Sequence, residues 1–78
     1  MKETTVEFVQ ELAEVKRASI RNRLVYAKRG KFLAYLLWDE SPRIRKEVAL
    51  QGYGLEVLLN DENAEVRKAA LDTMKKGA

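Results

Sequence analysis

The segment from residue 39 to residue 71, DESPRIRKEVALQGYGLEVLLNDENAEVRKAAL, decides the fold because a shift of 22 residues aligns it with its own sequence and with the residues before it. The shift places Asp61 on Asp39, and it pairs further apolar or glycine positions: Ala27 with Ala49, Gly30 with Gly52, Leu33 with Leu55, Leu36 with Leu58, and Leu37 with Leu59. Two columns have three members each, Arg23, Arg45 and Arg67, and Ser19, Ser41 and Asn63. A short fixed period is typical of a repeat protein in which each unit covers the apolar face of its neighbour.

The hydrophobic spacing of the first unit predicts helices and no strand. A first helix runs from Thr4 to about Arg17, with Thr4 and Glu7 as a capping box. Ser19 then begins a second helix, which Gly30 ends. One long helix through the junction is an alternative, because no residue there breaks a helix outright.

The second and third units each predict a short apolar helix, a turn and a longer helix. Ser41 as N-cap with Pro42 at the first helical position favours a helix start, since proline lacks an N–H that would be unpaired there. Asn63 is the matching N-cap of the third unit. The expected organisation is one all-α domain over residues 1–78, with units at about 4–29, 31–51 and 53–76.

The repeated segment resembles a known family of helical repeats. Residues 38–49, WDESPRIRKEVA, and 60–70, NDENAEVRKAA, are similar to the Asp, small or Pro, Val-Arg, Ala signature of HEAT-like repeats. The short period and the link QGYGL at 51–55 look more like the leucine-rich-repeat variant, a short all-helical relative. The resemblance implies an α-solenoid of about three two-helix repeats.

The first unit departs from the signature of the family. Arg17 stands in the Asp column and Asn22 in the Ile/Val column, and a longer helix replaces the short one. A degenerate first repeat with a polar outer face is what the end of a repeat array needs. We therefore interpret the first unit as a cap.

The composition argues against catalysis and against a metal site. The chain has no cysteine and no histidine, so thiolate ligands, the commonest metal ligand and the usual acid/base group are all missing. We expect no enzyme activity, no cofactor and no metal. No apolar run approaches the roughly 18 residues of a membrane span and the start is amphipathic, so we expect a cytoplasmic protein without membrane contact.

Basic residues are concentrated in the first half of the chain. The net charge is only +3, but no acidic residue lies between Glu14 and Asp39. This distribution predicts either a surface for a polyanion or an acidic protein, or an ordinary solvated helix face. The candidate residues for a partner or polyanion surface are Arg17, Arg21, Arg23, Lys28, Arg43 and Lys46.

The Asp and Arg columns have a structural and a chemical interpretation. Paired opposite charges at Asp39, Asp61, Arg45 and Arg67 suit a general acid or a phosphate clamp. In HEAT-like arrays, however, matching Asp and Arg residues form ladders between repeats and cap helices, and the resemblance implies that role here. Because its own unit has no such Asp, Arg23 is the member expected to be free for a ligand. Arg67→Ala is expected to lower the melting temperature.

The aromatic residues divide between core and surface. Phe8, Phe32 and Tyr26 lie on or next to apolar faces and are expected in the core. Trp38 is either packed under the first unit, which we favour, or exposed as an interface anchor flanked by Tyr35 and Tyr53.

The leading functional hypothesis is a non-catalytic scaffold for protein–protein interaction, because stacked helices build an extended surface without any reactive group. A second copy of the chain could then bury the apolar ends of the array. The alternative is binding to a nucleic-acid phosphate backbone through the basic face of the second helix, where Arg21 and Lys28 lie one heptad apart.

Overall fold

The computed structural model describes the backbone of residues 2–77 and the side chains of residues 6–77. Within this part of the chain all regular structure is helical and no strand occurs, so the predicted all-α class is confirmed. The helices are α1 (Lys2–Arg17), α2 (Ile20–Lys28), α3 (Leu33–Leu36), α4 (Pro42–Leu50), α5 (Leu55–Leu58) and α6 (Ala64–Gly77). None of them is long and apolar enough to cross a membrane.

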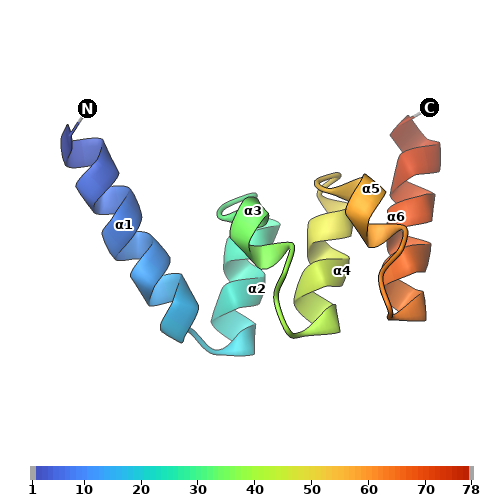
Figure 1. The fold of residues 1–78 in the computed structure, drawn as a ribbon, viewed down its shortest axis with the longest axis horizontal. Helices are drawn as coiled ribbons and strands as arrows, with labels where there is room; N and C mark the ends of the chain where they lie inside the picture. The colour runs from blue at the N-terminus through green and yellow to red at the C-terminus, as the bar shows by residue number, and fades with distance from the viewer. Residues whose placement is uncertain (1, 78) are drawn as a thin grey trace.

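The three helices α2, α4 and α6 stand side by side, and the short helices α3 and α5 lie across them (Figure 1). Helix α4 occupies the centre, since it packs against α2 on one side and α6 on the other. Helix α1 packs against α2 and leans away from it at its N-terminal end (Figure 1). The molecule measures 39 × 26 × 17 Å.

The helix starts of the first unit differ in part from the prediction. Ser19 Oγ accepts a hydrogen bond from the Asn22 N–H at 3.2 Å, and this cap separates α1 from α2, so the single long helix is excluded. Helix α1 begins at Lys2, which makes the capping box with Thr4 as N-cap wrong. Lysine and glutamate are good helix formers, so Lys2 and Glu3 extend the helix.

The caps of α4 and α6 use different atoms at equivalent positions. Asn63 Oδ1 accepts hydrogen bonds from the N–H groups of Glu65 and Val66, at 2.9 and 3.1 Å. Ser41 is the N-cap of α4, with proline following as predicted, but its hydroxyl makes no cap hydrogen bond. Its own N–H instead donates to Asp39 Oδ1 at 2.9 Å. The predicted starting points are therefore right, while the bond at Ser41 is not the expected one.

Left-handed backbone recurs at the turns between the helices. Gly30 and Gly52 follow the ends of α2 and α4, with φ of 72° and 83°. Phe32 and Gly54 precede α3 and α5, with φ of 58° and 64°. For Phe32 this conformation costs about 1 kcal/mol, because its Cβ crowds the backbone. Contacts of its ring with the rings of Phe8 and Tyr26, at 5.2 and 5.8 Å between centroids, help to offset that cost.

The core lies between the helices and consists mainly of aliphatic side chains. The buried residues are Val15, Ala27, Leu36, Leu37, Ile44, Val48, Ala49, Leu58, Val66, Ala69 and Ala70. The small alanines let neighbouring helices approach closely. Tyr26 and Phe32 pack against this core, as expected. Phe8 is 54% exposed, so its assignment to the core is wrong, although its ring contacts Phe32.

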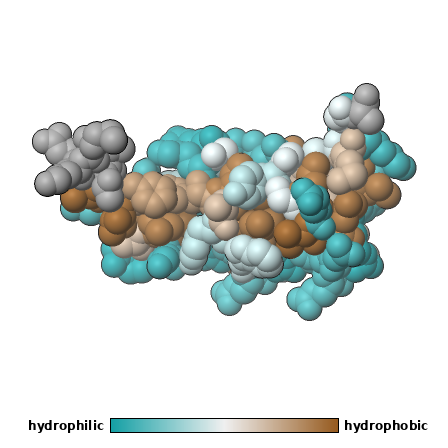
Figure 2. Space-filling view, turned by 45° about the horizontal axis from the view of Figure 1, so that its top comes forward, coloured by the Kyte–Doolittle hydropathy of each residue, from teal (hydrophilic) through white to brown (hydrophobic). Residues whose placement is uncertain are grey.

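Several apolar residues of the two end helices are exposed to solvent. They are Val6 and Val9 of α1 and Leu71 and Met74 of α6. No described element packs on the outer side of α1 or α6. Hydrophobic residues accordingly form a band along the length of the molecule, between hydrophilic surfaces (Figure 2).

Candidate functional site

Two bidentate ion pairs connect α2 with the loop before α4, and α4 with the loop before α6. Arg23 donates from Nε and Nη2 to the two carboxylate oxygens of Asp39, at 2.8 and 3.2 Å. Arg45 donates in the same way to Asp61, at 2.7 and 3.1 Å. All four side chains are at least 88% buried. We call this arrangement the Arg–Asp ladder, and each pair is one rung.

Each rung also fixes the backbone of a loop. Arg23 Nη1 donates to the carbonyl oxygen of Ala18 at 2.6 Å, and Arg45 Nη1 donates to that of Asp39 at 2.7 Å. The hydrogen bonds from Arg45 hold the pKa of Asp61 below its ordinary value, and they raise the pKa of Arg45. With both partners satisfied and largely buried, these residues have no free group for acid chemistry or phosphate binding.

The direction of the ladder corrects one prediction. Arg23 was expected to be free because its own unit lacks an Asp, but it pairs with Asp39 of the following unit. In each rung the aspartate comes 16 residues after its arginine. The short helix that follows each long helix places the next aspartate against the arginine of that long helix. Arg67 is therefore the member of the column that has no carboxylate partner among the described side chains, and it is exposed.

Trp38 is the most exposed large hydrophobic residue in the described part of the chain, with 69% of its surface accessible. The favoured expectation that it packs under the first unit is therefore wrong. The preceding residues, Leu36 and Leu37, are buried, and the following Asp39 is held in the ladder. With its neighbours fixed on both sides, the indole is left on the surface.

Two shallow grooves meet at Trp38. The larger has a volume of about 520 Å³, and its lining includes Trp38, Glu40, Val57, Asn60 and Glu62. The smaller has a volume of about 290 Å³ and is lined by Arg23, Tyr35, Trp38, Asp39 and Glu40. Trp38 and Glu40 line both grooves, so the indole stands on the ridge between them.

The Trp38 surface, which we define as Tyr35, Trp38, Glu40, Val57 and Glu62, is aromatic and acidic. Tyr35 and Val57 are each about 40% exposed, so they add apolar area beside the indole. Glu40 and Glu62 are exposed, and no described cation lies within salt-bridge distance of either. The aspartates in these grooves are neutralised by arginines of the ladder. The unpaired charge of Glu40 and Glu62 is negative, whereas a positive charge lies beside Tyr35, where Lys16 Nζ is 5.8 Å from the centroid of the ring.

The residues of the predicted basic surface lie in different surroundings. Arg17, Arg21, Lys28 and Arg43 are exposed, without a carboxylate partner in the described chain. Arg21 and Arg43 are the second residues of α2 and α4, which are neighbours.

The other two candidates of this basic surface have carboxylate partners. Arg23 belongs to the ladder, and Lys46 Nζ lies 3.7 Å from Glu65 Oε1. The structure therefore leaves a smaller basic surface than the sequence predicted.

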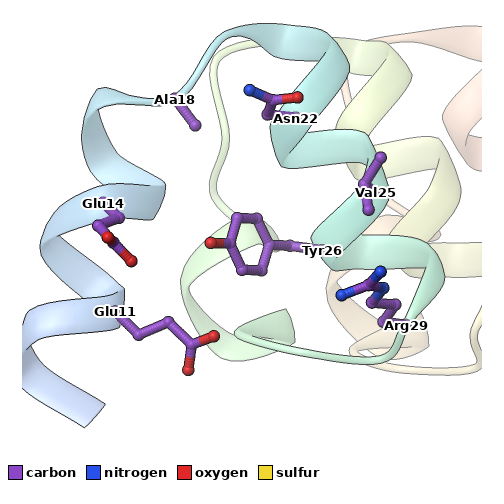
Figure 3. Close-up of a pocket in the computed structure, with 7 residues that line it drawn as sticks. All are labelled: Glu11, Glu14, Ala18, Asn22, Val25, Tyr26 and Arg29. Atoms are coloured by element: carbon purple, nitrogen blue, oxygen red, sulfur yellow. The ribbon is translucent and has the colours of Figure 1, made fainter. Parts of the chain in front are cut away.

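A third hollow, of about 440 Å³, separates α1 from α2 (Figure 3). Glu11 and Glu14 come from α1, and the Tyr26 side chain points across the gap toward α1 with Arg29 below it (Figure 3). Glu11 is already paired with Lys31, at 2.9 Å. Sequence reasoning missed this hollow because it arises from the tilt of α1. Its mixed charges favour no single class of ligand.

Comparison with known proteins does not assign the chain to a family. No protein-family model, no curated protein and no solved structure was found to match the chain. Among the described side chains, those of residues 6–77, no three His, Cys, Asp or Glu residues are grouped so that they could hold a metal ion.

Proposed function

We propose that the chain is an α-solenoid of three HEAT-like repeats that acts as a non-catalytic scaffold for a protein partner. The repeat interpretation is supported by residues 22 apart that occupy equivalent places: Arg23 and Arg45 in the ladder, Gly30 and Gly52 at the turns, and Ala27 and Ala49 in the core. The resemblance to HEAT-like repeats supports the same interpretation.

The exposed indole of Trp38 carries the functional proposal. Tryptophan is among the residues most enriched at the energetic centres of protein interfaces, because a rigid aromatic ring buries a large area at little entropic cost. Here the backbone beneath the indole is fixed by the Arg23–Asp39 rung, which acts on the residue next to Trp38. A ring on a fixed support, between two grooves, is suited to receive a partner segment.

The charge beside Trp38 indicates the chemistry of that partner. Glu40 and Glu62 provide unpaired carboxylates, and a tryptophan face attracts cations through its quadrupole. We therefore propose a partner segment with lysine or arginine next to an apolar residue. The cation lies over or beside the indole, and the apolar residue enters the groove next to Val57.

A peptide selection tests this proposal. A randomised peptide library is selected on the immobilised full chain, and the enriched peptides are titrated by fluorescence anisotropy against the wild type, Trp38→Ala and Leu50→Ala. Leu50 is the matched control, because it is an exposed aliphatic residue at the end of α4 outside both grooves.

The expected peptides are basic, and Trp38→Ala weakens their binding about 30-fold, the equivalent of about 2 kcal/mol, while Leu50→Ala leaves it unchanged. The double variant Glu40→Gln/Glu62→Gln weakens binding at low salt and less so at high salt. Enriched peptides that bind Trp38→Ala as tightly as the wild type would contradict the proposal.

Nucleic-acid binding is a second candidate, favoured by the position of Arg21 and Arg43 on neighbouring helices and by the exposed Lys28. Such cations suit a phosphate backbone. The third unit has Glu65 in the same column, which ends the basic row.

Anisotropy of labelled duplex DNA and single-stranded RNA, at low and physiological salt, tests this second candidate. It predicts salt-sensitive binding that the double variant Arg21→Glu/Lys28→Glu loses. Absence of binding at low salt would reject it.

A further inference from the structure

The Arg–Asp ladder ends in an incomplete rung at Arg67. Its Nη1 donates to the carbonyl oxygen of Asp61 at 2.6 Å, the same contact that Arg45 makes with Asp39, while Arg23 makes a similar contact with Ala18. In those two arginines Nε and Nη2 bind a carboxylate, whereas no described carboxylate pairs with these atoms of Arg67. The guanidinium is thus anchored as in a complete rung, with its carboxylate-binding edge open.

The surface around Arg67 corresponds to a surface that is covered inside the array. Leu71 occupies the column of Ala27 and Ala49, which are fully buried, yet Leu71 is 44% exposed and Met74 is 38% exposed. Arg67, Leu71 and Met74 are spaced i, i+4 and i+7, so they form one stripe of α6. We call this stripe, together with Lys75, the α6 end face.

The α6 end face is basic as well as apolar. Lys75 follows Leu71 by four residues and is exposed, so it adds a second positive charge. Asp72 of the same helix is bound by Lys68 at 3.2 Å, and no described carboxylate forms a salt bridge with Arg67 or Lys75. A partner for this face therefore has to bring negative charge.

The two complete rungs show which chemistry fits such a face. Asp39 and Asp61 each follow a short apolar helix, α3 or α5. Each also accepts a hydrogen bond through Oδ1 from the N–H two residues later, at 2.9 Å. This local bond orients the carboxylate toward the arginine.

We propose that the α6 end face is a second docking site, which binds an acidic partner segment made of a short apolar helix followed by an aspartate. The aspartate carboxylate bonds to Nε and Nη2 of Arg67, and the apolar helix covers Leu71 and Met74. The bidentate geometry is the one that makes arginine–carboxylate pairs strong and selective for arginine over lysine.

A second copy of the chain, stacked head to tail, is the less suitable occupant. Its exposed α1 would bring Val6 and Val9 and, at the C-terminal end of the helix, Arg17, whose charge has the same sign as that of Arg67. The first unit has Arg17 in the column where a rung requires aspartate. Stacking would therefore place one arginine near another.

The test uses a synthetic peptide with the sequence of residues 53–66, which contains the apolar helix and the aspartate of a complete rung. It is titrated into the isotope-labelled full chain, and NMR follows the Arg67 Nε–Hε group and the Leu71 methyl groups. Control arms use the peptide with Asp61→Asn and the full chain with Arg67→Lys.

Saturable shifts at both reporter groups are expected with about 1 mM peptide, with at least tenfold weaker binding in each control arm. Shifts of equal size with the Asp61→Asn peptide, or no shift at either group, would overturn the proposal. Trp38→Ala in the full chain is expected to leave these shifts unchanged, which separates this site from the Trp38 surface. Concentration-dependent self-association that Arg67→Lys abolishes would assign the face to a second copy and overturn the acidic-segment proposal.

Discussion

Helices α4 and α1 are both amphipathic, but they differ in how much of their apolar face is covered. Helix α4 has a neighbour on each side and buries Ile44, Val48 and Ala49 completely. Helix α1 has a neighbour on one side, and of its described side chains only Val15 is fully buried, while Val6 and Val9 are more than half exposed. Helix α1, with a single packing partner, therefore leaves more of its apolar face exposed than α4 does.

This difference predicts unequal stability along the chain. A segment with few buried contacts opens at a lower free-energy cost than a well-packed segment, so a helix with two interfaces opens less often than a helix with one. The central helices are expected to unfold as one cooperative unit, with the N-terminal half of α1 opening more readily. The following predictions test this contrast, from the largest expected effect to the smallest.

Ile44→Ala is expected to have the largest effect. The side chain is fully buried in α4, and its truncation removes apolar contacts and leaves a cavity, at a cost of about 4 kcal/mol. Urea unfolding followed by circular dichroism measures the loss. Leu50→Ala on the same helix is the control, and because Leu50 is half exposed its cost is about 1 kcal/mol or less. Equal losses of unfolding free energy in the two variants would contradict the burial of Ile44 in the core.

A comparison of Arg45→Met with Arg67→Met tests the ladder, because Arg45 is largely buried and paired with Asp61 while Arg67 is exposed and has no carboxylate partner among the described side chains. The first change leaves Asp61 largely buried without its cation, which costs about 3 kcal/mol. The second changes an exposed arginine without a carboxylate partner, and the expected cost is about 1 kcal/mol or less. For the same reason, Arg67→Ala is now expected to lower the melting temperature only slightly. Thermal melts that fall equally in both variants would contradict the observed direction of the ladder.

Asp61→Asn is expected to destabilise the chain by about 2 kcal/mol at neutral pH, through loss of charged hydrogen bonds to Arg45. Because the pKa of Asp61 is lowered in the folded state, its contribution is complete above the unfolded pKa of about 3.9. The contribution is then lost as the pH falls through the folded pKa. The difference in melting temperature between wild type and variant should narrow below about pH 4. A difference that stays constant down to low pH would show that the carboxylate charge contributes nothing.

Phe8→Ala is expected to have the smallest effect, about 1 kcal/mol or less, since its ring is half exposed and touches Phe32 on one side.

Hydrogen exchange of backbone amides compares the local stability of α1 and α4 without any substitution. Amides in the N-terminal half of α1 should exchange much faster than those of α4. Similar amide exchange rates in the two helices would contradict the predicted difference in their local stability.

Much of the fold follows from residues that act locally. Ser19, Ser41 and Asn63 stand at helix starts because their positions suit a cap, and the glycines after α2 and α4 allow left-handed turns. Such signals need no knowledge of distant contacts. The all-helical class and most helix ends were therefore predictable.

The site depends on non-local contacts, which the sequence does not reveal. Asp39 has an arginine six residues after it and another 16 before it, and only the packing of α2 against α4 selects Arg23. The outward position of Trp38 follows from the burial of its two predecessors and the pairing of Asp39.

The most direct test of the proposed function uses Trp38 as its own reporter, because it is the only tryptophan in the chain. The library-selected basic peptide is titrated into the full chain while indole emission and its quenching by acrylamide are recorded. The account predicts a shift of the emission to shorter wavelength and weaker quenching, with the same saturation point as the anisotropy titration. Unchanged emission and quenching at saturating peptide would show that the partner binds elsewhere and would contradict the account.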